Sequence, residues 1–414
     1  MSEGSPYVLI STDGHCGAGL LEYKPYLESR HHDAFDRWAA TYHDGWGDLD
    51  ATRDPDDRIG IASFAAPLNW DSAKRIAYTE VQGIAAEVLF PNTAPPFSPS
   101  GSITSRGPAS REEFELRFAG LRAHNRWLAD FCADLPGRRA GLAQIFLDDI
   151  DLAIDEVTWA KEAGLMGVLL PSDHLRSMVD LYFPAYDPLW AACADLDLPV
   201  HRHGVFPVEI GPEFGDAAPW IGQFEVPFYL TRAIAHLICA GVFERYPALR
   251  FVTTEIHNGA DLVAYLAKLD YMYESARIGG LPGSITPIQA AVDKLSRPPS
   301  SYFESNCSIG GPFDLRKAHQ AGVPNLMYGA DIPHSEGTAP HNREALRVMF
   351  AGLAEHEVRT LTSLTAARVY GFDLAALQTV ADRIGPTVEE VGRPLPVAAW
   401  PAYPADTRSP VFAG

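Results

Sequence analysis

The sequence predicts a (β/α)₈ barrel, and two observations support this prediction. Eight short apolar runs look like buried strands, and helical patterns separate most of them. The runs are continuous and lack a clean alternation of apolar and polar residues, which is typical of parallel strands buried on both faces. An open doubly wound sheet is the alternative. No GxGxxG motif follows the first strand, however, which weakens a dinucleotide-binding fold.

The expected elements follow in chain order. We expect strands at Tyr7–Thr12, Ala86–Phe90, Gly141–Leu147, Gly167–Leu170, Leu198–His203, Leu249–Glu255, Tyr302–Asn306 and Asn325–Asp331. We expect helices at Arg111–Leu135, Asp151–Ala163, Tyr186–Asp195, Pro227–Arg245, Ala260–Ile278, Pro312–Ala321, His341–Ala354 and Glu355–Val369. Together they predict one barrel domain over residues 1–384.

Two segments exceed the minimal barrel. Residues 20–84 form an insertion after the first strand, rich in aromatic and charged side chains, and we expect it over the mouth of the barrel or beside it. Residues 385–414 contain six prolines, so we expect no helix there. This tail is predicted to lie extended on the barrel or on a neighbouring subunit; on composition alone, a disordered tail is the alternative.

Composition and charge exclude some classes of function. A formal net charge of −20 repels phosphate backbones, so nucleic acid is not an expected partner. The sequence has no apolar run of 18 or more residues, so we expect no membrane span. The N-terminus has no signal-peptide pattern, and the five cysteines are scattered without a CxxC pair. These features predict a reduced, cytoplasmic protein.

Residues of the type that bind metals lie at the ends of four expected strands. Asp13 and His15 follow the first strand, and His201 and His203 end the fifth. The sixth and eighth strands end in a carboxylate with a histidine nearby: Glu255 with His257, and Asp331 with His334. Residues i and i+2 of a strand point to the same side, and the carboxyl ends of barrel strands meet at one mouth. Imidazole and carboxylate there suit Zn²⁺, Mn²⁺ or Fe²⁺.

Each of these residues also has a purely structural interpretation. Glu255 could form a buried ion pair with Arg202 or Arg232, and Asp331 could form a turn or cap a helix. A thiolate nucleophile at Cys16 or Cys307 is a further alternative, although a small buried cysteine is commoner. The metal prediction rests on the coincidence of four strand ends that carry such residues.

At these positions the sequence resembles the amidohydrolase-related family typified by aminocarboxymuconate semialdehyde decarboxylase. The resemblance covers roughly residues 7–373, and five motifs carry it: STDGH, LPVHRHG, GVFERYPALRFVTTE, YGADIPHSEGT and TAARVYGFD. The chain departs from the family pattern in three places, which are the Cys-Gly-Ala after DGH, the Thr365 where Asn is usual, and the insertion at 20–84.

The resemblance implies roles for individual residues. It implies that His15 and His203 bind the metal, and that Asp13 takes a position held by His, Glu or Asp in different members. Asp331 would bind the metal or move a proton. Glu255 stands where many members have a second catalytic His, whose imidazole function His257 could recover.

Two reactions fit such a site. The first is non-oxidative decarboxylation of an aromatic or unsaturated carboxylic acid, with Asp331 or His257 protonating the carbon that loses CO₂. The second is hydrolysis of a C–N, C–O or C–C bond by metal-activated water, with Asp331 as the base and His257 or Glu255 serving the leaving group. A catalytically inactive binding barrel is the third possibility. We expect decarboxylation, because more of the resembling proteins are decarboxylases.

The remaining expectations concern ligands and assembly. One divalent metal is expected, with zinc favoured over manganese or iron, and a binuclear site through Glu255 stays open. The substrate is expected to be a small molecule, and the expected substrate contacts are His201, Arg202, His334 and Asn306. Arg202 would bind an anionic group, since guanidinium suits carboxylates. The proline-rich tail and the family resemblance predict a homodimer.

Overall fold

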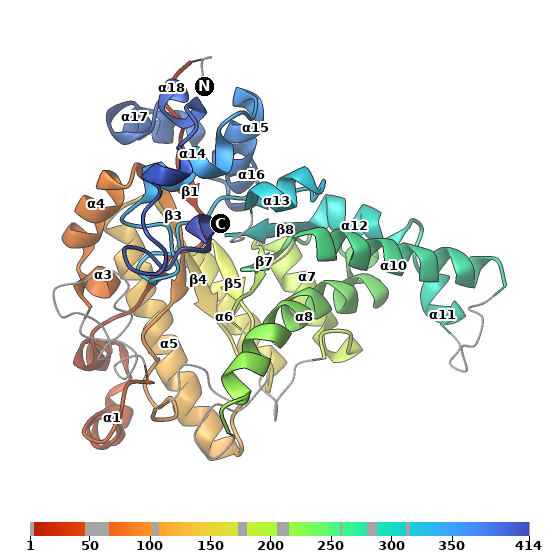
Figure 1. The fold of residues 1–414 in the computed structure, drawn as a ribbon. Coiled ribbons are helices and arrows are strands. Elements are labelled where there is room, and N and C mark those ends of the chain that lie inside the picture. The colour runs from red at the N-terminus through yellow and green to blue at the C-terminus, as the bar shows by residue number, and fades with distance from the viewer. Residues whose placement is uncertain are drawn as a thin grey trace.

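The strands of the chain form a parallel barrel. The computed structural model describes residues 4–45, 66–101, 107–172, 180–204, 215–256, 259–279, 288–311 and 315–413. Neighbouring strands pair in parallel in the order β1-β3-β4-β5-β6-β7-β8-β9 (Figure 1). Their bounds are β1 Leu9–Ser11, β3 Ile84–Pro91, β4 Arg139–Gln144, β5 Gly167–Leu169, β6 Val200–Arg202, β7 Phe251–Thr254, β8 Cys307–Gly310 and β9 Leu326–Met327. A further short strand, β2 (His15–Cys16), continues the direction of β1 and pairs with β3.

Backbone hydrogen bonds between the first and last strand regions close the barrel. The amide of Thr12 donates to the carbonyl of Tyr328 at 2.9 Å, and the amide of Asp331 donates to that of Asp13 at 2.8 Å. Next along the two segments, the amide of His15 donates to the carbonyl of Ile332 at 2.7 Å. Closure leaves no free edge between the two ends of the sheet, and the predicted (β/α)₈ barrel is confirmed.

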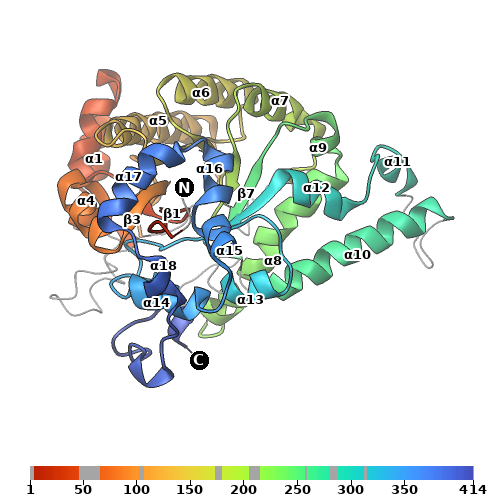
Figure 2. The same ribbon diagram turned by 90° about the horizontal axis from the view of Figure 1, so that it is seen from above.

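Helices surround the barrel, as the view along its axis shows (Figure 2). Several begin at a side-chain cap, as Ser110 caps α5 and Asp149 caps α6. No helix in the described residues is long and apolar enough to cross a membrane. The main helices are α5 Arg111–Ala133, α6 Ile150–Glu162, α7 Asp187–Asp195, α8 Ala218–Cys239, α9 Val242–Arg245, α10 Gly259–Arg277, α11 Gln289–Val292, α12 Pro299–Asn306, α13 Leu315–Gln320, α14 Asn342–Phe350, α15 Glu355–Arg359, α16 Thr365–Tyr370 and α17 Leu374–Ile384.

One predicted strand is wrong. Residues Tyr302–Asn306 end the helix α12, and the strand β8 follows directly at Cys307–Gly310. A short apolar run does not distinguish a strand from one turn of a buried helix, and here Pro299 occupies the first helical turn, where its missing N–H is harmless. The true strand was not apparent because its residues, Cys-Ser-Ile-Gly, are mostly small.

The described part of the insertion lies beside the barrel. It comprises the 3₁₀ helices η1 (Leu20–Tyr26) and η2 (Ser29–His31) and the helices α1 (His32–Ala39), α3 (Pro67–Trp70) and α4 (Ser72–Val81). Buried side chains of η1 and α1 pack with those of α5 in one apolar cluster. Figures 1 and 2 show α1 and α4 on the outside of the barrel, with α1 near α5.

The C-terminal tail folds back onto its own chain. The ring of Phe412 is buried and lies 6.1 Å from that of Trp400 and 6.4 Å from that of His341. The guanidinium of Arg347 on α14 donates to the carbonyls of Arg393 and Pro394, at 2.9 and 3.1 Å. The expectation of no helix in the tail is wrong: two short 3₁₀ helices, η6 (Val397–Ala399) and η7 (Pro410–Phe412), form among the prolines, and an α-helix precedes them. This short helix, α18 (Val388–Gly392), forms at the start of the tail before most of the prolines, aided by a Thr387–Glu390 capping box.

Candidate metal centre

Asp13 is the most deeply buried acidic group of the site. It follows β1, its side chain is fully buried, and neither carboxylate oxygen accepts a hydrogen bond from the described residues. Two glycines make room for it. A Cβ on Gly311 would lie 2.5 Å from Asp13 Oδ2, and one on Gly329 would lie 2.7 Å from Asp13 Cβ. A buried carboxylate without donors is costly, so this environment points to a cation as the missing partner.

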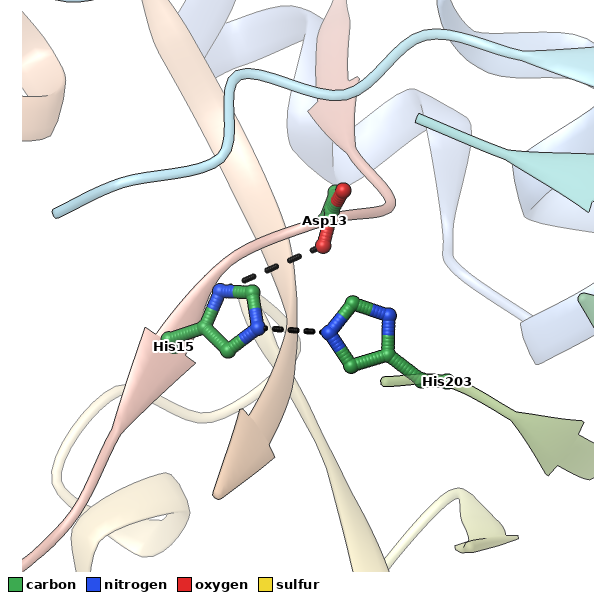
Figure 3. A group of neighbouring side chains, drawn as sticks. All are labelled: Asp13, His15 and His203. Carbon is green, nitrogen blue, oxygen red and sulfur yellow. Dashed lines mark hydrogen bonds and ion pairs between the residues drawn. The ribbon is translucent and has the colours of Figure 1, made fainter. Parts of the chain in front are cut away.

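His15 stands between the other donors. Its Nε2 lies 2.8 Å from Nε2 of His203, and its Nδ1 lies 3.2 Å from Oδ1 of Asp331 and 4.0 Å from Oδ1 of Asp13. Figure 3 shows the two imidazole rings edge to edge, with Asp13 beside the far nitrogen of His15. Phe90, which is part of β3, packs against the ring of His203, with 4.2 Å between the centroids, and limits where the imidazole can turn.

His203 follows β6, and the next strand fixes its orientation. Its Nδ1 hydrogen-bonds to the hydroxyl of Thr254, the last residue of β7, and lies 3.9 Å from a carboxylate oxygen of Glu255. A metal-binding histidine usually has its second ring nitrogen held in this way, which selects the tautomer and leaves the first nitrogen free to bind.

Asp331 is bonded to a second histidine. Its Oδ1 lies 2.9 Å from Nδ1 of His334, whose Nε2 lies 3.1 Å from the side-chain oxygen of Asn92. The amide nitrogen of Asn92 in turn donates to Asn69 at 2.7 Å, in the part of the insertion that forms α3. Both ring nitrogens of His334 thus face acceptors, which favours the doubly protonated imidazolium. Burial lowers the pKa of His334, but the carboxylates of Asp331, Glu336 and Glu255 together outweigh burial and raise this pKa to about 9.

The donors fit one divalent ion. Three overlapping groups have ligand atoms within 4.8 Å of one another: Asp13–His15–His203, His15–Asp331–His334 and Asp13–Glu255–Asp331. Two imidazoles and two carboxylates form a donor set that suits Zn²⁺ or Mn²⁺. The site is therefore suited to a metal in both donor chemistry and unmet hydrogen bonding.

The pKa shifts at the site have a common cause. Burial raises the pKa of Asp13 well above its usual range, and the neighbouring carboxylates of Asp331 and Glu255 raise it further. Burial and the charge of Asp331 also raise the pKa of Glu255, to about 8. Burial lowers the pKa of both His15 and His203, which favours the neutral imidazole that binds metals. A bound cation would offset the crowding of negative charge.

Two of the acidic residues have strained backbones. Glu255 and Asp331 have φ angles of 55° and 54°, in the left-handed region that few non-glycine residues adopt. Each follows a strand at the mouth, where the left-handed turn redirects the chain immediately beside His203 or Asp13. Strain of this kind collects at functional sites, because the surrounding structure must hold it.

The other predicted contacts are not part of the metal groups. His201 is buried deeper, with its ring nitrogens 3.1 Å from the carbonyl of Val168 and 3.0 Å from the hydroxyl of Tyr370. Arg202 is fully buried and donates to the carbonyl of Pro171. His257 lies outside the described residues, so its catalytic role stays a prediction.

Asn306 lies at the opposite end of the barrel. It immediately precedes β8, and its amide donates to the carbonyls of Pro247 and Leu249, at 3.0 and 2.8 Å. Its expected substrate contact depended on the wrong strand assignment.

Sequence reasoning missed Thr254 and Asn92. Both lie at the carboxyl end of a strand, β7 and β3 respectively. The rule that identified His203 could have selected them, but a lone Thr or Asn does not suggest a metal. Their contribution depends on the histidines that they contact.

A model of the amidohydrolase family matches residues 90–372 of the chain. The chain belongs to this amidohydrolase family. The resemblance inferred from the motifs is therefore confirmed. Among curated proteins, the amidohydrolase is similar to γ-resorcylate decarboxylase of Rhodococcus jostii (strain RHA1), with 31% identity over 160 residues. That match covers 36% of this chain and 48% of the relative, so the similarity spans about half of the relative's length.

Solved structures share the fold at low sequence identity. An amidohydrolase from Mycobacterium avium subsp. paratuberculosis has 19% identity and a TM-score of 0.60, over 88% of this chain and 99% of the other. The 5-carboxyvanillate decarboxylase of Novosphingobium aromaticivorans, in complex with manganese and 4-hydroxy-3-methoxy-5-nitrobenzoic acid, has 21% identity and a TM-score of 0.58. It covers 90% of this chain, and 99% of its own length is matched.

His203→Ala should abolish metal retention by this amidohydrolase. We expect about one divalent ion per wild-type chain and less than about a tenth of that in the variant, because an imidazole donor is lost. Plasma mass spectrometry of purified protein measures this. His319→Ala is the matched control, since His319 on α13 pairs with Glu357 instead. Full metal content in His203→Ala would contradict the ligand assignment.

Gly311→Ala should weaken metal binding more than its backbone strain explains. Gly311 has φ +50° and contacts Asp13, whereas Gly322 has φ +84° with no described atom within 4 Å of an added Cβ. Both alanine variants should lose about 1–2 kcal/mol of stability to the left-handed backbone. Only Gly311→Ala should also lower metal affinity, by about tenfold or more, in a chelator competition. Equal affinities in the two variants would show that Asp13 does not bind the metal.

Proposed function

We propose that this amidohydrolase is a metal-dependent, non-oxidative decarboxylase of an aromatic or unsaturated carboxylic acid. The observation that carries the proposal is the buried group of Asp13, His15, His203 and Asp331, in which the carboxylate of Asp13 accepts no hydrogen bond from the described residues. The decarboxylase names of the Rhodococcus and Novosphingobium relatives support the reaction class. They support an aromatic acid with an oxygen substituent near its carboxylate as the first substrate to test.

A divalent ion held by Asp13, His15, His203 and Asp331 would neutralise the substrate carboxylate and hold the ring in register. We propose zinc or manganese for this position. The sequence favoured zinc, whereas the Novosphingobium enzyme contains manganese. Two carboxylates among four donors are compatible with either ion.

The chain's own residues would move the proton. Decarboxylation breaks the bond between the carboxyl carbon and the ring; the electron pair stays on the ring carbon, which takes a proton, and CO₂ leaves. Asp331 is placed to deliver this proton, because it reaches the metal group and is bonded to His334. His334 would then return a proton to Asp331 across their 2.9 Å contact. His334 is also a proposed substrate contact.

Hydrolysis is the second candidate, and Glu255 is the observation that favours it. This carboxylate shares a group with Asp13 and Asp331 and lies 3.9 Å from Nδ1 of His203. A third carboxylate at a metal site could act as a base toward water or bind a second ion. In a decarboxylase, Glu255 would instead line the substrate cavity.

Asp331→Asn should lower kcat by about 10²- to 10⁴-fold, since it removes the proposed proton carrier. Wild-type enzyme loaded with zinc or with manganese is assayed for CO₂ release from hydroxybenzoates, such as 2,6-dihydroxybenzoate, and for hydrolysis of aryl esters and amides. Asp382→Asn, at an exposed position on α17, is the control. Turnover only of esters or amides would replace the decarboxylase by the hydrolase, and an unchanged Asp331→Asn would remove Asp331 from the reaction.

We propose further that two copies of the chain pair through α8. Trp220, Phe224 and Phe228 are 80%, 82% and 58% exposed and recur every fourth residue, so they form one row along the helix. The first half of α8 extends past the strands on the outside of the barrel (Figure 1). The ring of Tyr182, half exposed, continues the row through its contact with His236.

A second copy is the occupant that the charge of this surface favours. Burying this row, with the neighbouring Phe183, would remove on the order of 600 Å² of surface. A standard interface buries about 800 Å² from each partner, so the row would form the centre of the interface and the surface around it would supply the rest. Residues 218–231 contain a single charge, Glu225, within a chain of net charge −20. A nearly uncharged face lets two such acidic chains approach each other. The C-terminal tail packs on its own α14 and is not needed for this pairing.

Sedimentation velocity should give twice the 45.2 kDa chain mass for the wild type. The double variant Trp220→Glu/Phe224→Glu should sediment as a monomer, because the charges would face each other across the interface. Leu21→Glu, at an exposed apolar position on η1, is the control and should remain dimeric. A monomeric wild type, or a double variant that stays dimeric, contradicts the α8 interface.

The same proposal includes a reducing, cytoplasmic location. All five cysteines are free, and four of them are buried. Free, unpaired thiols are typical of proteins in a reducing compartment.

A further inference from the structure

Arg75, a buried arginine of the insertion, contacts the backbone of residues at the candidate metal centre. Arg75 lies on α4 and is fully buried, and its guanidinium forms a two-pronged pair with Glu87 of β3. The distances are 3.0 Å from Nε to Oε2 and 2.8 Å from Nη2 to Oε1. Such a pair fixes the guanidinium plane, because both prongs must align.

The remaining donors of Arg75 reach the main chain of both closing strands. Nη1 donates to the carbonyl of His15 at 2.6 Å, and Nη2 donates to that of Ile332 at 3.3 Å. Nη1 also donates to the carbonyl of Leu68, in the α3 turn, at 2.9 Å. One guanidinium therefore connects the residue that carries the first imidazole ligand with the residue that follows Asp331.

Gly14 allows this approach. A Cβ at Gly14 would lie 3.3 Å from both Arg75 Nη2 and Glu87 Oε1, tighter than ordinary contact. Gly14 separates the two proposed metal donors Asp13 and His15. Because Gly14 has no side chain, the Arg75–Glu87 ion pair can lie against its backbone.

We infer that Arg75, held by Glu87, is a positioning residue that sets the distance between His15 and Asp331 and thereby the affinity for the metal. Arg75 touches neither metal nor substrate; it acts through the two carbonyls. This inference rests on the metal centre proposed above. It assigns the insertion a function that the motifs did not indicate.

The test separates positioning from stability. Removing Arg75 alone would leave the charge of Glu87 buried without a partner and destabilise the fold. The double variant Arg75→Met/Glu87→Met keeps the net charge and removes both buried charges. We expect it to fold with a lowered thermal midpoint, because three carbonyls lose a donor, and to bind Zn²⁺ or Mn²⁺ about 10- to 100-fold more weakly in a chelator competition. Cobalt-substituted protein should show shifted visible absorption bands.

Arg138→Met is the matched control. Like Arg75, Arg138 donates to both a carboxylate and a main-chain carbonyl, those of Glu80 and Ala85, each at 2.7 Å. Among the described residues, it contacts none of the metal centre. It should lower the thermal midpoint and leave metal affinity unchanged. If the Arg75/Glu87 variant does not fold, Arg75→Lys is measured instead and should show the same weakening.

Each outcome decides a different claim. A double variant or Arg75→Lys that binds metal as tightly as a metal-binding wild type overturns the positioning role alone. A wild type that takes up no metal overturns the metal centre, and this inference with it. An equal loss of metal affinity in Arg138→Met would overturn the positioning role. It would mean that a general loss of stability weakens metal binding, and not the loss of the hydrogen bonds from Arg75 to His15 and Ile332.

Discussion

The hydrogen bond from the amide of Asp331 to the carbonyl of Asp13 both closes the barrel and places two carboxylates next to each other. Because the two strands pair in parallel, their carboxyl ends arrive at the same place, and the side chains that follow them have little freedom to separate. Like charges at such a distance, out of contact with water, oppose folding unless a cation joins them. Other features of the mouth accompany this pair of carboxylates. They are the glycines beside Asp13, the imidazoles of His15 and His203, and the left-handed backbone of Glu255 and Asp331.

The neighbours of the centre hold these donors in place from three directions. Thr254 orients His203 from the next strand, and Asn92 holds His334 from β3. Arg75 reaches the backbone of His15 from the insertion. Metal sites depend on such supports because an ion tolerates little error in the positions of its ligands. The insertion, which is not part of the minimal barrel, therefore contributes a contact to the candidate metal centre.

Much of this was predictable from the sequence, and the exceptions have physical causes. Buried parallel strands consist of apolar runs, so most of the barrel could be located from the sequence. The polar residues that end those runs predicted the metal donors Asp13, His15, His203 and Asp331, whose side chains the fold brings together. Tyr302–Asn306 was wrongly predicted to be a strand, because two adjacent apolar residues such as Tyr302 and Phe303 are compatible with a buried helix as well as a strand. Arg75 could not be found at all, since its role depends on carbonyl groups that local sequence does not position. The same holds for the depth at which His201 lies and for the fold of the tail on α14.

The pairing of the first and last strands of the barrel also has a consequence for biosynthesis. The hydroxyl of Thr12 bonds to the carbonyl of Tyr328, 316 residues later, so the contacts beside Asp13 join segments that leave the ribosome far apart in time. Until the last strand emerges, the first strand must wait with one edge unpaired and its acidic residue without its partners. The complete donor set therefore exists only after Asp331 has been synthesised and the last barrel strand has paired with the first. Metal capture by all four donors would thus follow barrel closure, and nascent chains released before residue 331 would lack the complete centre.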